Sequence, residues 1–351
     1  MDVPRDNADA RPRRSVDSPV VGTVPERAPW KEIPSLRLVD PQLRQVADLI
    51  HQSLLSLNAE RELAPLFGHL RVPCGKMLRP ALVLLSGRCF GPLTDEHIRV
   101  SAILEMIHHA TLLHDDVLDD GRMRRGVPTA NCLWGNESAV LLGDFVLSQV
   151  FRMTADLDPA TVEIIAQTAV RVCQGELRQA MQRGNRRLSE AQYLNIIMEK
   201  SAAFFGGCCR LGGRLAHAGP DQVEALARFG LHAGIAFQIA DDLLDVAGDE
   251  NETGKTVRSD FVGDKLTLAV IHLLRTVDAS DRAAVCAMLA SPEPSHRKLT
   301  DLLVQHGSLE YARTQAAGHV ARAIEALENL PPSEARDALV ETAQFMAHRA
   351  A

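Results

Sequence analysis

Two stretches of this sequence share one acidic pattern: His114-Asp115-Asp116-Val117-Leu118-Asp119 and Ala240-Asp241-Asp242-Leu243-Leu244-Asp245. Each contains Asp-Asp-x-x-Asp and lies within Leu, Ile and Ala residues at helical spacing. In a helix the first and last Asp of such a segment project from one face, about 6 Å apart along the axis. Both stretches therefore predict a helix that carries two carboxylates on one face.

The helical pattern continues outward from these stretches over most of the chain. From Leu36 onward, apolar residues recur at three- and four-residue spacing, as in Val46, Ile50 and Leu54, and no segment shows sustained strand alternation. Gly and Pro clusters such as Gly219-Pro220 mark helix ends and divide the chain into roughly ten helices without a convincing linker. The expected fold is all-α, a single large domain over residues 35–351.

Residues 1 to about 34 mix Pro, Arg, Asp and Val without an apolar period, so a flexible tail is expected there. No stretch reaches the roughly 18 apolar residues of a membrane span, and no signal-peptide pattern is seen near the start. Seven cysteines without a C-x-x-C pair fit reduced thiols in a cytoplasmic protein better than a disulfide framework. A net charge of −7 disfavours a general nucleic-acid binder.

The paired carboxylates predict a binding site for a hard cation. Like charges on a buried face repel unless a cation offsets them, and oxygen ligands without Cys or His favour magnesium, which often shares its shell with phosphate. The alternative is that the acidic residues are solvated or interact with a helix dipole, but two copies of one pattern argue against it. A carboxylate di-iron site would need a second Glu-x-x-His to match Glu105 and His108, and the one available, Glu293 to His296, lies in a Pro-rich loop.

Other polar and basic residues accompany the acidic segments. His108 lies seven residues before Asp115, and Gln238 lies three before Asp241, so each carboxylate pair has a polar neighbour on its own face. Arg and Lys side chains are what a diphosphate requires beside such carboxylates. They cluster at 75–80 and 122–126, with Lys200, Lys255 and Lys265 farther on.

Taken together, these motifs resemble those of the all-trans polyprenyl diphosphate synthases, which elongate isoprenoid chains. The resemblance runs from about residue 36 to the C-terminus. It rests on Gly75-Lys76-x-x-Arg79-Pro80, the two aspartate-rich segments, Arg124-Arg125-Gly126, Gly143-Asp144, Lys200-Ser201 and Phe237-Gln238. It implies an antiparallel helical bundle around a deep central cavity, a homodimer, and a cluster of three magnesium ions when substrate is bound.

The resemblance also implies a role for each matching residue. The expected metal ligands are Asp115, Asp119, Asp241 and Asp245, which with Lys200 form the catalytic set. The expected isopentenyl diphosphate site is Lys76, Arg79, His108 and Arg125. The expected contacts to the allylic diphosphate are Arg124, Lys200, Ser201, Gln238, Lys255 and Lys265. The implied reaction is ionisation of the allylic diphosphate, attack by isopentenyl diphosphate and loss of a proton.

Some positions depart from the family pattern, and other activities compete with elongation. Ser259-Asp260 and Asp264-Lys265 replace the usual Asp-Asp and Gly-Lys, which leaves the role of Lys265 the least defined. A terpene cyclase of the same fold would lack the second aspartate motif and the Gly-Lys-x-x-Arg segment. A non-catalytic partner subunit would have lost Asp from one motif. Neither loss is seen here.

Product length is expected to depend on the helix before Asp115. Short-chain members of the resembled family carry bulky aromatic residues four or five positions before this motif, whereas this chain has Thr111 and Ala110. The pocket should therefore stay open, giving a heptaprenyl to decaprenyl product of the kind used in quinone side chains. A farnesyl or geranylgeranyl product is the alternative. Phe145, Phe151 and Met153 are candidate residues for the pocket floor.

Overall fold

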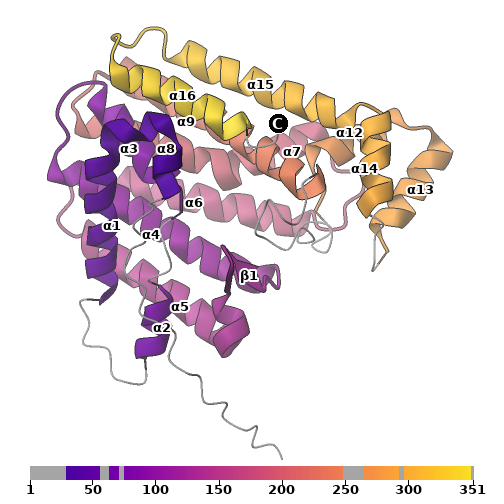
Figure 1. Ribbon diagram of the computed structural model, residues 1–351, viewed down its shortest axis with the longest axis horizontal. Helices are drawn as coiled ribbons and strands as arrows, with labels where there is room; N and C mark the ends of the chain where they lie inside the picture. The colour runs from indigo at the N-terminus through magenta and orange to yellow at the C-terminus, as the bar shows by residue number, and fades with distance from the viewer. Residues whose placement is uncertain (1–28, 56–62, 71–74, 248–264, 292–295, 349–351) are drawn as a thin grey trace, which may run out of the picture.

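A computed structural model describes residues 29–55, 63–70, 75–247, 265–291 and 296–348. Helices make up nearly all of the regular structure in these ranges, which confirms the all-α fold (Figure 1). The α-helices are α1 (Asp40–Leu55), α2 (Ala64–His69), α3 (Leu78–Arg88), α4 (Asp95–Leu118), α5 (Ala130–Thr154), α6 (Pro159–Met181), α7 (Glu190–Ile197), α8 (Ala203–Leu215), α9 (Pro220–Ala247), α12 (Leu268–Thr276), α13 (Ala279–Leu289), α14 (His296–Gln305), α15 (Ser308–Ala326) and α16 (Glu334–His348).

Three shorter helical turns and one hairpin complete the described elements. The 3₁₀ turns η1 (Pro29–Glu32) and η2 (Pro34–Val39) precede α1, and the π-helical turn η3 (Met198–Ala202) joins α7 to α8. Strands β1 (Met123–Arg124) and β2 (Val127–Pro128) pair antiparallel between α4 and α5. This hairpin falls on a Gly and Pro cluster where the sequence predicted a helix break.

Helix starts follow the expected capping chemistry. Asp158 accepts hydrogen bonds from the backbone N–H groups of Ala160 and Thr161, and Pro159 occupies the first helical position of α6. Ser189 forms a capping box with Gln192 at the start of α7. These caps define where the helices that carry the site residues begin.

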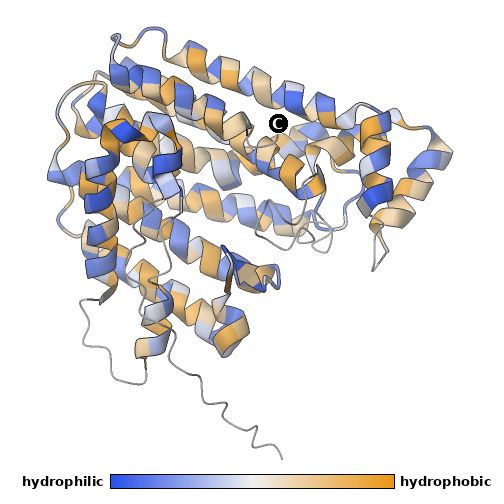
Figure 2. Ribbon diagram, in the orientation of Figure 1, coloured by the Kyte–Doolittle hydropathy of each residue, from blue (hydrophilic) through white to orange (hydrophobic). Residues whose placement is uncertain are grey.

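The apolar faces of the helices form two core clusters that share α9. The larger cluster contains Leu104 of α4, Phe205 of α8 and Phe229 of α9, and the smaller one contains Leu243 of α9 and Leu273 of α12. Figure 2 shows hydrophobic and hydrophilic residues alternating around nearly every helix, as expected for helices that bury one face. Helix α8 packs against both α4 and α9, the helices that carry the two aspartate segments. No helix in the described part of the chain has the length and apolar character needed to cross a bilayer.

Residues 29–34, which the sequence analysis placed in the N-terminal tail, form helical turns with buried apolar residues. Trp30, Ile33, Leu36 and Val39 are each 3% exposed or less and recur every third residue, which is the period of a 3₁₀ helix. The Trp30 indole donates a hydrogen bond to Asp40 (2.8 Å). The ordered domain therefore includes residues 29–34, and residues 1–28 lie outside the described part.

Replacing Trp30 by alanine should lower the free energy of unfolding by about 3 kcal/mol, because it removes a buried aromatic side chain and leaves a cavity. Chemical denaturation of wild type and variant measures the difference. Lys31→Ala, which changes the exposed neighbouring residue, is the control and should change stability little. Equal midpoints for Trp30→Ala and wild type would contradict the packing of this segment.

Stability should also fall with acid because of a histidine pair between α9 and α15. Burial, together with His232 and Arg322, lowers the pKa of His319 to about 4, and the two histidine Nδ1 atoms lie 3.1 Å apart. The unfolded chain then binds a proton more readily than the folded chain between about pH 6.5 and 4. Stability should be full above this range and drop by about 1–2 kcal/mol as pH falls through it. His319→Gln should reduce the drop measured by denaturation at about pH 7.5 and about pH 5; an undiminished drop would reject this origin.

Candidate active site

Asp119, the last residue of the first motif, lies between two cations. It caps the C-terminus of α4, with its own N–H bonded to the carbonyl of Asp115. Arg183 Nη2 lies 2.8 Å from Asp119 Oδ1, and Lys265 Nζ lies 2.9 Å from Oδ2. The Lys265 side chain is only 11% exposed. Lys265, whose role was least defined from sequence, thus lies at the first motif, together with an arginine that the motifs did not indicate.

Asp115 lies in the last turn of α4 with other carboxylates nearby. Burial raises its pKa to about 6, and the charges of Glu176 and Asp119 add to the effect, while Lys200 and Arg124 oppose it. A raised carboxyl pKa means that the charged form is disfavoured in the protein alone. The repulsion expected from the sequence is therefore present at this residue, and a bound cation would relieve it.

The middle Asp of each motif is also held by hydrogen bonds within the protein. Asp116 receives hydrogen bonds from Arg124 Nε (3.0 Å) and Nη2 (2.7 Å). Asp242 accepts from the Tyr193 hydroxyl (2.6 Å) and from Gln238 Nε2 (2.8 Å). Both middle residues are buried. These hydrogen bonds fix the middle Asp of each motif in place, and the assignment of the first and last Asp as metal ligands stays a prediction.

Several side chains expected at the allylic diphosphate also bind within the protein. Arg124 pairs with Asp116, and Ser201 Oγ donates to Gln238 Oε1 (2.6 Å). Ser201, Gln238, Asp242 and Tyr193 thus form one hydrogen-bonded chain from η3 through α9 to α7. This chain sets the position of the second motif relative to η3.

Lys200 projects from the π-helical turn η3. Its Nζ lies 2.8 Å from Glu176 Oε1 and donates to Gln179 Oε1 (2.7 Å). Burial acts to lower its pKa, but Glu176 and Asp115 raise it above the ordinary lysine value, so the side chain is a cation. A Cβ on Gly175 would overlap the Lys200 backbone nitrogen, so glycine is needed for α6 to approach this turn. Single π-turns within helices are frequent at functional sites.

The residues expected at the isopentenyl diphosphate site converge around the start of α3. The Arg79 guanidinium lies over the rings of Phe204 (5.0 Å) and Phe205 (4.8 Å). Lys76 Nζ lies 5.1 Å from the centre of the Phe345 ring, so α16 also borders this region. The Arg125 guanidinium covers Gly75, where a Cβ would collide with it. Segments 75–79 and 124–125, distant in sequence, are thus brought together.

His108 and Glu105 lie beside this cationic group. Burial lowers the pKa of His108 well below 6.5, and the charges of Arg79 and Arg125 contribute, so the imidazole is neutral. Burial acts to raise the pKa of Glu105, but His109, whose Nε2 is 3.5 Å from Oε1, and the two arginines lower it. Glu105 is therefore an ionised carboxylate that balances buried arginine charge. Its partner is His109, not His108, the second residue of the Glu-x-x-His pattern considered for a di-iron site. The other Glu-x-x-His begins at Glu293, and residues 292–295 lie outside the described residues.

Left-handed backbone concentrates at these segments. Of the four non-glycine residues with positive φ in the described part of the chain, three are Met77 (51°), Asp120 (49°) and Arg125 (52°). Each follows or interrupts a predicted binding segment. Such conformations cost about 1–3 kcal/mol each and cluster at functional sites.

The donor set fits divalent cations that are shared with substrate. Asp115, Asp119, Asp241 and Asp245 offer oxygen ligands, and the repulsion at Asp115 is what a cation would offset. No three His, Cys, Asp or Glu side chains converge on one point among the described residues. Carboxylate oxygens suit a hard divalent cation, and such cations commonly take one or two carboxylates together with substrate phosphates.

The chain was compared with known proteins. The family model described as Polyprenyl synthetase matches residues 60–305. The chain belongs to this family. A nonaprenyl diphosphate synthase of Mycobacterium tuberculosis is 35% identical over 89% of this chain and 90% of its own length. A short chain isoprenyl diphosphate synthase of Methanothermobacter thermautotrophicus is 32% identical over 89% and 95%. A polyprenyl synthase structure from Caulobacter crescentus, complexed with calcium and isoprenyl diphosphate, has a TM-score of 0.84 and 31% identity, covering 93% of this chain and 100% of that one.

As a polyprenyl synthase the protein is a prenyltransferase. The structure explains why one of its motifs, Gly143-Asp144, needs glycine at its first position. A Cβ on Gly143 would overlap the His114 ring, so glycine is needed for α5 to pack on the end of α4. The His114 ring is also 3.1 Å from the Val140 carbonyl oxygen and 3.5 Å from Asp144 Oδ1. This motif thus holds the helix that carries Asp115.

The sequence analysis of this polyprenyl synthase missed three residues. Each lies on another helix or loop, and no local spacing pattern marks it. Arg183 binds Asp119, Glu176 binds Lys200 and Tyr193 binds Asp242. Of the three candidate floor residues, Phe151 is 73% exposed in the single chain. Met153 is buried, and Phe145 packs on Phe67 with ring centres 4.7 Å apart. Lys255 lies outside the described residues.

Proposed function

We propose that this polyprenyl synthase adds isopentenyl diphosphate units to an allylic diphosphate primer and makes an all-trans product of heptaprenyl to decaprenyl length. The observation that carries the proposal is the separation of two charge environments. Carboxylates of the first motif lie with Lys200, Lys265 and Arg183, whereas around Arg79 the positive charges outnumber the carboxylate of Glu105. One diphosphate has to leave and the other only has to be held, so two different environments are expected.

The allylic side is suited to the departure of a diphosphate. Magnesium ions, three with substrate bound, would be held by Asp115, Asp119, Asp241 and Asp245 and would neutralise the leaving group. Lys200 and Lys265 are buried or nearly buried cations that can add hydrogen bonds to the same oxygens. Arg124 and Gln238 orient the middle Asp of each motif and so hold the ligand pairs in place.

The isopentenyl side is suited to holding a diphosphate that stays intact. Lys76, Arg79 and Arg125 supply three positive charges, and neutral His108 can donate a hydrogen bond without adding charge. Phe204 and Phe205 beside Arg79 keep this region apolar around the carbon skeleton. No protein nucleophile is required, and the departing diphosphate can accept the proton that is lost.

Assembly and location follow as parts of the same proposal. Exposed apolar side chains lie at helical spacing on the consecutive helices α5 and α6, among them Leu141, Phe151, Leu177 and Met181. A homodimer would cover them, as a stable interface needs a contiguous apolar centre.

The free cysteines among the described residues support a cytoplasmic enzyme. A quinone side chain is the proposed use of the product.

One assay tests the function directly. The protein is incubated with magnesium, isopentenyl diphosphate and farnesyl or geranylgeranyl diphosphate, and product length is measured by chromatography after dephosphorylation. Heptaprenyl to decaprenyl products support the proposal. Products that stop at geranylgeranyl length would favour the short-chain alternative, and cyclised hydrocarbons without elongation would favour a terpene cyclase.

Arg79→Ala should raise the KM for isopentenyl diphosphate about 10-fold or more, while changing the KM for the allylic primer by less than about 2-fold, because a charge-assisted fork to one diphosphate is lost. Steady-state kinetics with each substrate varied in turn measures both constants. Arg79→Lys should restore part of the affinity, since it returns the charge without the fork. An equal rise in both constants would reject two separate diphosphate sites.

A further inference from the structure

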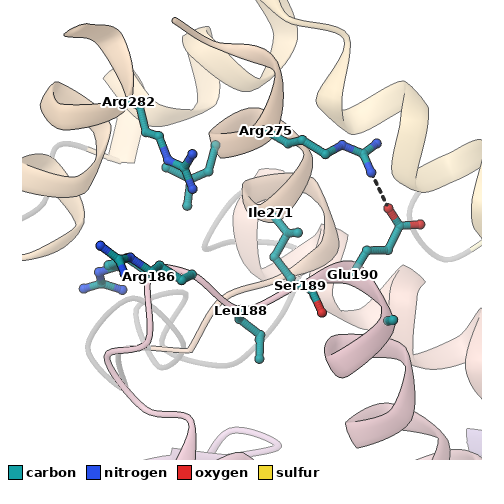
Figure 3. Close-up of a pocket in the computed structure, with 10 residues that line it drawn as sticks. Arg186, Leu188, Ser189, Glu190, Ile271, Arg275 and Arg282 are labelled. Carbon is teal, nitrogen blue, oxygen red and sulfur yellow. Dashed lines mark hydrogen bonds and ion pairs between the residues drawn. The ribbon is translucent and has the colours of Figure 1, made fainter. Parts of the chain in front are cut away.

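A pocket lined by several arginines lies near the first aspartate motif, outside the residues placed in either substrate site. It has a volume of about 390 Å³ and is formed by residues 186–191, by Ile271, Leu274 and Arg275 of α12, and by Arg282 of α13. Figure 3 shows Arg282 above Arg186 on one side and the Arg275–Glu190 pair on the other. The walls thus come from two regions that are distant in sequence, residues 186–191 and the consecutive helices α12 and α13.

The charge of this pocket is unbalanced. Its lining carries four arginines, Arg186, Arg187, Arg275 and Arg282, against one carboxylate, Glu190, so the formal charge is +3. That carboxylate is already occupied, because Arg275 Nη1 lies 3.1 Å from Glu190 Oε2 and the Tyr311 hydroxyl donates to Oε1 (2.7 Å). Among the described lining residues no other carboxylate balances the remaining arginines, so the pocket attracts an anionic ligand.

Two of the arginines are available for such a ligand. Arg187 and Arg282 are exposed and form no ion pair with any described residue. Arg186 donates from Nη2 to the carbonyl of Leu289 (3.0 Å), which fixes its side chain at the end of α13. One oriented guanidinium and two unpaired ones around a small pocket suit the several oxygens of a phosphate group.

The pocket also lies near the candidate active site. Arg183, which pairs with Asp119, lies three residues before Arg186, so their Cα atoms are at most about 11 Å apart. The apolar part of the lining is limited to a few side chains such as Leu188, Ile271 and Leu274. This composition suits a small anion rather than a long prenyl chain.

We infer that this arginine pocket, lined by residues 186–191 with Arg275 and Arg282, binds the diphosphate group of a small molecule at a site separate from catalysis. Two sources can supply that group: the inorganic diphosphate released at each elongation step, or the head of isopentenyl diphosphate. Naming these sources rests on the proposed function, whereas binding of the anion itself does not.

The test measures binding without turnover. Full-length protein is titrated with inorganic diphosphate by calorimetry in a chelator, so that no metal is present and no reaction occurs. The double variant Arg187→Gln with Arg282→Gln should lose a class of sites or bind it about 10-fold or more weakly. The matched control, Arg88→Gln with Arg228→Gln, removes two exposed arginines far from the pocket and should bind as wild type does.

Three results would overturn the inference: no binding by wild type, equal binding by the pocket variant, or an equal loss in the control. Both variants change exposed side chains, and thermal denaturation checks that they remain folded. A parallel titration with isopentenyl diphosphate distinguishes the two sources of the diphosphate group. The pocket variant will bind a ligand more weakly than the wild type only if that ligand binds in the pocket. Failure of the elongation assay with intact pocket binding would reject the proposed function and leave the anion site in place.

Discussion

Asp115→Ala should lower kcat by about 1,000-fold and leave the protein folded, because it removes a predicted metal ligand where leaving-group charge must be stabilised. The free energy of unfolding should stay the same or rise. The raised pKa of Asp115 shows that its charged form is disfavoured in the folded protein, mainly by burial and then by Glu176. Single-turnover kinetics at saturating substrate, together with chemical denaturation, measures both effects. Near-normal turnover in magnesium would reject the metal-cluster proposal.

The adjacent residue, Asp116, should behave in the opposite way. Asp116→Ala breaks a buried pair with Arg124 and should cost about 2 kcal/mol of stability, at the low end for such pairs because Arg124 is 30% exposed. This variant is the matched control for Asp115→Ala, since both remove one carboxylate from the same turn of α4. If both variants lost stability equally, the contrast between the carboxylate with a raised pKa, Asp115, and the ion-paired carboxylate, Asp116, would be wrong.

The helical fold could be predicted because its signals are local. Apolar spacing and Gly or Pro breaks depend on neighbouring residues, and both aspartate segments lie on helices as expected. The 3₁₀ turns at 29–39 give no α-helical signal because their apolar residues recur every third residue rather than every three and four residues. The β1–β2 hairpin was missed because its turn places Arg125 and Gly126 both at positive φ, and only the glycine signals this.

The residue types of the candidate site could be predicted from the sequence. The side chains that pair with these residues could be predicted only in part. A pair such as Asp115 and Asp119 is set by helix geometry, so one sequence is enough to propose it. The pairing of Asp119 with Arg183 joins residues 64 positions apart and depends on how α6 and its following loop pack. Likewise, exposure of Phe151 depends on which face of α5 turns outward, and its apolar character alone does not indicate that.

Product length should depend on Ala110, which lies on α4 five residues before Asp115. A helix rises 1.5 Å per residue, so Ala110 is about 7.5 Å below the predicted metal ligand, where the chain would pass if it grows along α4 as proposed. Ala110 is buried, and Thr111 beside it turns its hydroxyl to the carbonyl of His108 (2.8 Å). Neither residue has the bulk to close a passage at this level.

Ala110→Tyr should therefore shorten the main product from the heptaprenyl to decaprenyl range to geranylgeranyl length or below, because a tyrosine ring would fill the passage. Product chromatography measures the change, and Glu96→Tyr, at an exposed position on the same helix, should leave the product length unchanged. The KM for isopentenyl diphosphate should also change little, since the predicted binding residues lie elsewhere. If Ala110 only packs against a neighbouring helix, the ring has no space to enter, and the variant should lose several kcal/mol of stability as an overpacked core. A stable variant with the wild-type product distribution would likewise show that the growing chain does not pass Ala110.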